Sequence, residues 1–202
     1  MLRWIAALGV ALVLGACAAP GSNTPLPVAQ IQDAAFVDPG PKKLKLITVV
    51  NNRTGAGGHT ALLVSGSQQV IFDPAGSFRP DWLTEHGDVL YGVSPTIFQY
   101  YQNAHARSTH HIVSQEIQVS PAVAEQALAL VQAQGNVASA FCANSTSSIL
   151  RQLPGFQDIA TTFYPVNLQQ QFAQRPGVVT RRHYEDDDGN VLDGIPDLAP
   201  TQ

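Results

Sequence analysis

Two short apolar runs on either side of a polar loop constrain the fold of this chain more than any other feature. Residues 59–64 and 70–73 flank Ser65-Gly66-Ser67-Gln68-Gln69. This pattern predicts a β-hairpin. The run at 44–50 is apolar and β-branched and predicts a strand just before it. The glycine-rich residues 51–58 then form the turn between that strand and the hairpin.

The loop of the hairpin decides which side chains face each other. If Ser65-Gly66-Ser67 forms the loop, Val64 pairs with Gln68, and His59 lies directly opposite Asp73. Opposed side chains on antiparallel strands share one face, with their Cβ atoms about 5 Å apart. A two-residue loop would shift the pairing by one residue, so this register is a hypothesis.

Helices are expected to follow the hairpin. A serine that caps a helix is often followed by a proline as the first helical residue. This pattern predicts one helix from Ser94-Pro95 through about Ala104 and another from Ser120-Pro121 to Gly135. The remaining expected elements are a short helical segment at 80–85, strands at 110–119 and 178–184, and a helix from Cys142 to Leu153-Pro154-Gly155. The predicted fold class is α+β, a small antiparallel sheet packed by helices.

The N-terminus indicates the compartment. A positive start and an apolar run at 4–14 precede Leu14-Gly15-Ala16-Cys17, which resembles the lipobox of bacterial lipoproteins in every position. The resemblance implies removal of residues 1–16, diacylation of Cys17 and a membrane anchor made of lipid. Ala18 after the cysteine favours the outer membrane, facing the periplasm. An ordinary cleaved signal with an incidental cysteine is the alternative.

The rest of the chain then divides into three parts. Residues 17–43 are expected to be the lipidated cysteine and a flexible tether, because they are rich in Ala, Pro, Gly, Ser and Asn. A single domain should span 44–184, and 185–202 form a tail with six of the fifteen acidic residues. A net charge of −4 gives no reason to expect nucleic acid as a partner. The sequence leaves the oligomeric state open.

The second of the two cysteines is the candidate for chemistry. With Cys17 lipidated, Cys142 has no partner for a disulfide in a compartment that oxidises thiols. The start of a helix points N–H groups and a positive dipole end at the sulfur, which lowers the pKa of the thiol. A neighbouring imidazole would complete an ion pair, and the N–H of Cys142 would be placed to bind an oxyanion. A buried cysteine acting as a small hydrophobic residue is the alternative.

The same residues carry a family resemblance. Gly58-His59-Thr60-Ala61-Leu62-Leu63-Val64, the return through Val70-Ile71-Phe72-Asp73-Pro74-Ala75-Gly76, and a later cysteine that begins a helix resemble the circularly permuted papain-like group. This group includes the permuted NlpC/P60 amidases and the lecithin-retinol acyltransferase-like proteins. The resemblance covers about residues 44–182. It implies that Cys142 is the nucleophile, His59 the base and Asp73 the third polar residue, although Asp73-Pro74 could also form a plain turn.

Other patterns give weaker signals. Residues 55–60 lack the last glycine of a dinucleotide-binding loop. His105, His110 and His111 show no spacing typical of a metal site, and Val191 replaces the glycine that a calcium loop beginning at Asp186 would need. No cofactor or metal is therefore expected.

The sequence predicts an envelope lipoprotein with a Cys-His thiol hydrolase or acyltransferase site. Its substrate would be an amide or ester, such as a cell-wall peptide, a lipid or an N-acyl group. The alternative is an inactive papain-like lipoprotein that serves as a binding or scaffolding module.

Overall fold

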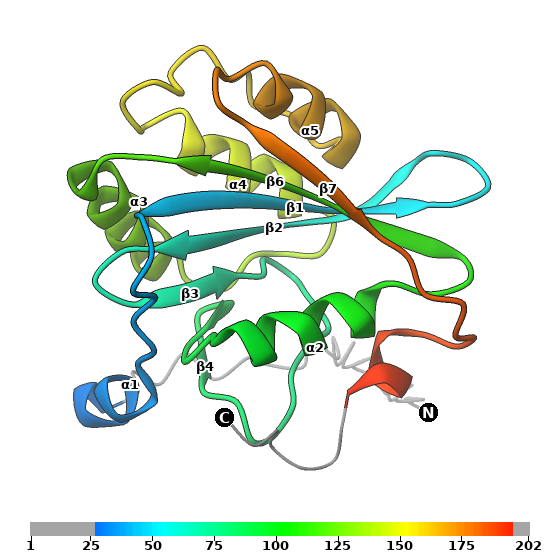
Figure 1. The fold of residues 1–202 in the computed structure, drawn as a ribbon, viewed down its shortest axis with the longest axis horizontal. Coiled ribbons are helices and arrows are strands. Elements are labelled where there is room, and N and C mark those ends of the chain that lie inside the picture. Colours follow the sequence, from blue (N-terminus) through cyan, green and yellow to red (C-terminus); the bar gives the residue numbers. More distant parts are fainter. Residues whose placement is uncertain (1–26, 196–202) are drawn as a thin grey trace, which may run out of the picture.

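Seven strands form one antiparallel sheet in the computed structural model, which describes residues 27–195 (Figure 1). Their spatial order is β4-β5-β3-β2-β1-β6-β7, so β1 lies between the hairpin strand β2 and the later strand β6. The strands are β1 (Lys43–Asn51), β2 (Gly57–Ser65), β3 (Gln69–Phe72), β4 (Glu85–His86), β5 (Val89–Leu90), β6 (His110–Gln118) and β7 (Val179–His183).

Helices cover both faces of this sheet, because the central strands are apolar on both sides. Leu44, Leu46 and Leu62 belong to a core shared with three helices, whereas Ile47 and Leu63 point to the opposite face and pack with a fourth. The first face carries α3 (Pro121–Gln134), α4 (Cys142–Leu150) and α5 (Pro165–Ala173), and the second carries α2 (Pro95–His105) (Figure 1).

The predicted helix starts are confirmed. Ser94 and Ser120 each accept a hydrogen bond from the backbone N–H three residues later, at 3.3 Å, and proline follows in the first helical position. The predicted α+β class and antiparallel sheet are also confirmed. None of the helices within residues 27–195 is both long and apolar enough to cross a membrane.

Two predicted segments differ from the structure. Residues 80–85 form turns that lead into β4 and contain no helix. The last part of the predicted tether is structured: α1 (Val28–Ala34) is followed by a segment in which the carbonyl of Phe36 accepts a hydrogen bond from Gln69 at 2.7 Å. Cys17, the signal segment 1–16 and the tail residues 196–202 lie outside the described residues.

The hairpin forms as predicted, but its register differs. The loop is Gly66-Ser67-Gln68, Val64 pairs with Val70, and Ser65 pairs with Gln69. The predicted pairing of Val64 with Gln68 is therefore wrong by two residues. A shift by two keeps every side chain on its predicted face, because side chains alternate with a period of two. Asp73 therefore stays on the same face of the sheet as His59, but it lies diagonal to His59 and not directly opposite it.

Candidate active site

The start of β2 holds His59 at an irregular point of the sheet. Pairing with β1 runs regularly to Val49 and His59 and then shifts, so that Val50 lies opposite Gly57. Gly58 is thus a bulge residue, and bulges commonly redirect a neighbouring side chain. Pairing with β3 begins only at Leu62. The first residues of β2 are therefore open on that side, where α4 approaches them.

A turn that begins at Asp73 holds its carboxylate. The N–H of Gly76 donates to the carbonyl of Asp73 at 2.9 Å, and Ala75 has a positive φ of 56°. The buried carboxylate of Asp88 accepts the N–H of Ala75 at 2.9 Å and that of Val137 at 2.8 Å, which ties the turn to the segment before α4. Gly76 leaves space for the Asp73 carboxylate, because a methyl group at position 76 would overlap it.

The thiol of Cys142 lies at the first residue of α4, as predicted. No side chain caps this helix start. The sulfur instead receives the backbone N–H groups of Ala143, in the same helix, and of Thr60, in the open part of β2. Only 8% of the residue is exposed, so the thiol is largely removed from water without being sealed in the core.

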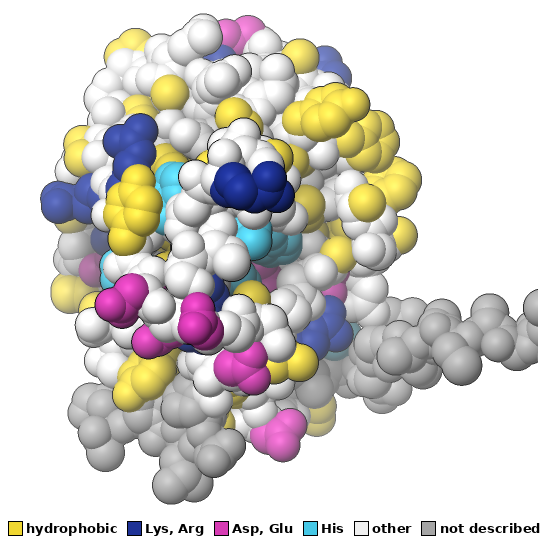
Figure 2. Space-filling model, turned by 90° about the vertical axis from the view of Figure 1, so that its right-hand side faces the viewer, with side chains coloured by type: hydrophobic (Ala, Val, Ile, Leu, Met, Phe, Trp, Pro, Cys, Tyr) yellow, Lys and Arg dark blue, Asp and Glu magenta, His cyan; other side chains and the backbone are white. Residues whose placement is uncertain are grey.

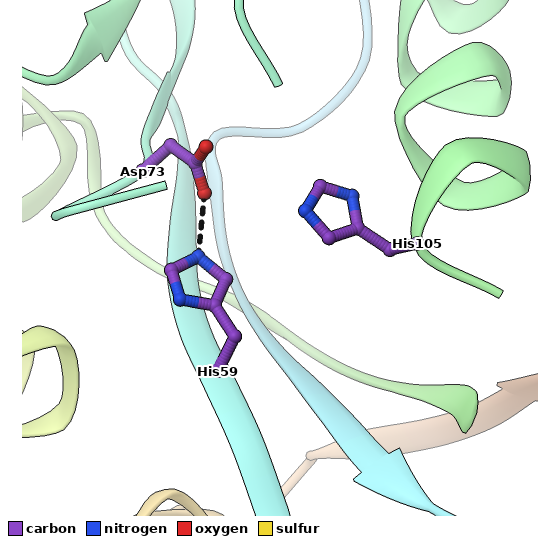
Figure 3. Close-up of side chains that lie close together, drawn as sticks. All are labelled: His59, Asp73 and His105. Atoms are coloured by element: carbon purple, nitrogen blue, oxygen red, sulfur yellow. Dashed lines mark hydrogen bonds and ion pairs between the residues drawn. The ribbon is translucent and has the colours of Figure 1, made fainter. Parts of the chain in front are cut away.

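His59 joins the thiol to Asp73. Its Nε2 lies 2.7 Å from Oδ1 of Asp73, and its side chain is hydrogen-bonded to Cys142. Because Nε2 is occupied by the carboxylate, Nδ1 is the ring nitrogen left for the sulfur. Figure 3 shows Nε2 directed at Asp73 and the second ring nitrogen directed away from it.

The row of side chains from Cys142 through His59 to Asp73 is called the reactive row. Its electrostatics favour a thiolate on Cys142 and an imidazolium on His59. Burial alone would lower the pKa of His59, but the charge and hydrogen bond of Asp73, and then Cys142, raise it to about 10. Burial also disfavours the charged form of Cys142, and so on its own it would raise the pKa of the thiol. The hydrogen bond and charge of His59 and the two N–H groups outweigh burial and lower this pKa below its ordinary value.

Two residues of α2, Tyr101 and His105, complete the site. The sequence indicated no role for Tyr101 and gave His105 only as a weak candidate for a metal ligand. The hydroxyl of Tyr101 donates to Oδ1 of Asp73 at 2.6 Å. Burial raises the pKa of Asp73, but His59 and then His105 and Tyr101 bring it below its ordinary value. Asp73 is thus an ionised acceptor, and His59 must donate its Nε2–H to it. Tyr101 lies on the buried face of α2 together with Ile97 and Ala104, so its place in the sequence is that of a core residue.

His105 lies beside the reactive row without joining it. Its ring is stacked on that of His59, 5.9 Å between centroids, and its Nδ1–H donates to the carbonyl of Tyr101 at 2.8 Å (Figure 3). Burial lowers the pKa of His105 to about 4, with the charge of His59 acting in the same direction and that of Asp73 against it. His105 is therefore neutral at pH 7.

These side chains also bear on the question of a metal. One ligand-type atom from each of His59, Asp73 and His105 lies within 4.8 Å of the others, so they could surround a cation. The bond between His59 and Asp73 already uses two of these atoms, and Tyr101 donates to the same carboxylate oxygen. The arrangement fits a hydrogen-bonded acid–base group better than a ligand set. His110 and His111, weighed with His105 from the sequence, are not part of this group.

A cavity of about 350 Å³ opens on the side of His59. Part of its wall comes from the C-terminal segment, where the short 3-10 helix η1 (Val191–Gly194) follows the acidic residues. On the face shown in Figure 2, histidine side chains gather in the middle and acidic side chains lie below them. The lining residues are Val49, Gly58, His59, Ala75, Gly76, Ser77, His105, Arg107, Thr109, His110, Gly189, Asn190 and Val191.

Comparison of the chain with protein-family models, with curated proteins and with solved structures finds no match. The predicted residues His59, Asp73 and Cys142 nevertheless lie together in one hydrogen-bonded row. Their chemical roles remain predictions, which this geometry supports.

Proposed function

We propose that this protein is a cysteine hydrolase or acyltransferase of the permuted papain-like kind, anchored in the cell envelope through lipid on Cys17. The observation that carries the proposal is the row from Cys142 through His59 to Asp73. A thiol at an uncapped helix start, an imidazole with one nitrogen fixed by a carboxylate, and N–H groups at the sulfur are the parts that thiol catalysis uses.

The reaction follows from the roles of these atoms. The thiolate of Cys142 attacks the carbonyl carbon of an amide or ester, and the carbonyl oxygen becomes an oxyanion near the first N–H groups of α4. His59 then gives its Nδ1 proton to the departing amine or alcohol, the bond to the leaving group breaks, and a thioester remains. Water, deprotonated by His59, attacks the thioester and releases the acid and the thiolate. A second alcohol or amine in place of water gives acyl transfer.

Asp73 and its partners have a defined part in this cycle. Because Asp73 accepts the Nε2–H of His59, the ring keeps Nδ1 toward the sulfur in both protonation states. Tyr101 donates a hydrogen bond to the same carboxylate oxygen and so helps to hold Asp73 in place. Given the proposed envelope location, peptide amides of the cell wall are the first substrate class to test, and lipid or N-acyl groups are the second.

Alkylation of Cys142 by iodoacetamide tests the proposal in the full chain. Site-resolved mass spectrometry separates Cys142 from Cys17. We expect alkylation at pH 7 to be at least about tenfold faster than that of free cysteine, because the thiolate fraction is larger. His59→Ala should slow it to the rate of an ordinary thiol. Equal rates in the original chain and the His59→Ala variant would contradict the proposal and favour a binding or scaffolding module.

The substrate requires a separate experiment. The protein and its Cys142→Ser variant are incubated with cell-wall fragments and with phospholipid, and released products are identified. Products that form only with the cysteine present would support the hydrolase. The chemistry of these products would distinguish peptide from acyl substrates.

A further inference from the structure

Three exposed aromatic side chains lie beside the thiol. Phe141, which directly precedes Cys142, is 44% exposed, Phe163 is 52% exposed and Tyr164, the next residue along the chain, is 75% exposed. The rings of Phe141 and Phe163 make an edge-to-face contact, with 5.1 Å between their centroids. We call these three residues the aromatic patch; within residues 27–195, Tyr184 is the one other exposed aromatic residue. A group of exposed apolar side chains marks a binding surface more often than a single one does.

The fold holds this patch against the two elements that carry the thiol and the base. The N–H of Thr162 donates to the hydroxyl of Ser147, in α4, at 3.2 Å. Pro165, the first residue of α5, lies so close to Gly57 in β2 that a methyl group at position 57 would overlap it. Residues 162–165 therefore run from α4 to the start of β2, and packing of the backbone fixes the position of the patch next to the reactive row.

The cavity beside His59 leaves this side of the site to the acyl group. None of its lining residues comes from α4 or from residues 156–165. In the proposed reaction, His59 protonates the leaving group, whereas the acyl carbon becomes bonded to the sulfur of Cys142. The acyl group then extends from the sulfur over the neighbouring surface, and Phe141 is the residue directly before the sulfur in the chain.

The two segments that form the patch carry no charge. Residues 136–150 and 159–174 contain no Lys, Arg, Asp or Glu. On the face shown in Figure 2, hydrophobic side chains gather at the upper right, beside the histidines in the centre. A charged acyl group would lose hydration on such a surface without gaining a partner, whereas a hydrocarbon chain would bury apolar area against the rings. The exposed rings and the absence of charge in these segments together favour an apolar acyl group.

We propose that the aromatic patch binds the apolar acyl group of the substrate while this group is transferred to Cys142. This inference rests on the proposed function. It favours the second of the two substrate classes, lipid or N-acyl groups, over cell-wall peptides. The aromatic residues are specificity residues here and take no part in the bond changes.

Alkyl methanethiosulfonates test the patch in the full chain. The thiolate of Cys142 attacks the sulfur that carries the alkyl group, a new disulfide bond forms, and methanesulfinate leaves with the electron pair of the bond that breaks. The alkyl chain thus takes the position of the acyl group. The measured quantity is the rate with the hexyl reagent divided by the rate with the methyl reagent, and site-resolved mass spectrometry separates Cys142 from Cys17.

We expect this ratio to be at least about tenfold higher for Cys142 than for free cysteine, because a fully buried methylene favours association about fourfold and the hexyl chain adds about five of them. Phe163→Ser should lower the ratio several-fold, and Phe163→Leu should keep part of the preference. Tyr184→Ser removes the exposed aromatic residue outside the patch. It is the matched control and should leave the ratio unchanged.

Three outcomes would overturn the proposal: a ratio equal to that of free cysteine, an unchanged ratio in Phe163→Ser, or a loss in Tyr184→Ser equal to that in Phe163→Ser. If Phe163→Ser keeps the ratio but binds phospholipid vesicles less tightly, the patch contacts the membrane and the proposal is likewise wrong. Circular dichroism of each variant shows that the fold is kept.

The same experiment separates this inference from the proposed function. The methyl reagent reports the reactivity of the thiol itself, and this reactivity cancels in the ratio. A thiol of ordinary reactivity would therefore refute the hydrolase without changing the comparison of chain lengths. A ratio equal to that of free cysteine would refute the acyl site without affecting the thiol.

Discussion

At the scale of residues, the charge of Asp73 decides the state of the thiol. Asp73 raises the pKa of His59 against the effect of burial, and the resulting imidazolium lowers the pKa of Cys142. In Asp73→Asn, burial is no longer opposed by a carboxylate, so the pKa of His59 should fall and that of Cys142 should rise. We expect the midpoint of the pH profile of Cys142 alkylation to move up by about one unit or more, since a nearby opposite charge shifts a pKa by 1–3 units.

Tyr101→Phe is the matched control for this change. It removes one hydrogen bond to the same carboxylate but leaves the charge in place. The loss of a hydrogen bond to a charged group costs about 1.5–3 kcal/mol, so Tyr101→Phe should lower the free energy of unfolding while moving the alkylation midpoint much less than Asp73→Asn. A midpoint that stays unchanged in Asp73→Asn would show that Asp73 does not control the thiol.

The site could be predicted only in part at this scale. Cys142 and His59 could be identified from the sequence, because a lone thiol at a helix start and a histidine at a strand start are recognisable as candidates for chemistry. Asp73 was found from a register that proved wrong by two residues, and the prediction survived because an even shift keeps the face. Tyr101 was missed, because nothing local shows that an aromatic residue on the apolar face of a helix reaches a site formed by distant strands.

At the scale of elements, glycines set how closely the turn and the helices approach the site. At Gly76 a methyl group would overlap the carboxylate of Asp73, whereas a methyl group at Gly58 would meet its nearest atoms at 3.8 Å, an ordinary contact. The carboxylate can rotate away from a methyl group more easily than the backbone can shift. We therefore expect Gly76→Ala to break the bond from His59 to Asp73 and to slow Cys142 alkylation at pH 7 as Asp73→Asn does.

The same comparison predicts a modest loss of stability. Inserting a methyl group where there is no space typically costs about 1–3 kcal/mol, so Gly76→Ala should unfold at a lower denaturant concentration. Gly58→Ala, next to His59 on the same strand, should stay close to the original protein in both measurements. If Gly76→Ala keeps full thiol reactivity, the turn does not position the carboxylate.

The elements themselves were largely predictable, and the exceptions have physical causes. Strands β1, β2, β3, β6 and β7 and helices α2, α3 and α4 follow from apolar runs and Ser-Pro starts. Helix α5 was missed because it begins after Tyr164, which provides no side-chain cap, and its polar stretch contains only two buried apolar residues besides its first proline, Leu168 and Phe172. Strands β4 and β5 have two residues each, too few for any period to show.

At the scale of the whole molecule, the sheet separates two cores, and α2 joins one of them to the site. Tyr101 and Ala104 belong to the core on one face of the sheet, while Leu62 and Phe72 belong to the core on the other. The reactive row lies where β2 is no longer covered by β3, so the nucleophile from one layer reaches the base on the strand. His105 lies in the buried part of this junction. Its titration is therefore coupled to the stability of the entire fold.

This coupling predicts how acid affects the protein. The pKa of His105 is lowered from 6.5 to about 4 on folding. Between these values the unfolded chain binds the proton and the folded chain does not, so stability falls as the pH falls through this window. His59, with its raised pKa, is protonated in both states there and adds no slope. The loss attributable to His105 is up to about 3 kcal/mol, since one pH unit corresponds to about 1.4 kcal/mol.

Urea unfolding at pH 6.5 and at pH 4.5 measures this effect. The original chain should lose stability between the two values, and His105→Gln should lose clearly less, because a glutamine takes up no proton. His86→Gln removes a half-buried histidine from β4 and controls for the loss of one histidine. If His105→Gln and the original chain lose the same free energy on acidification, His105 is already protonated in the folded protein. The conclusion that His105 is neutral would then be wrong, because a charged His105 would place a second positive charge on the ring stacked with His59.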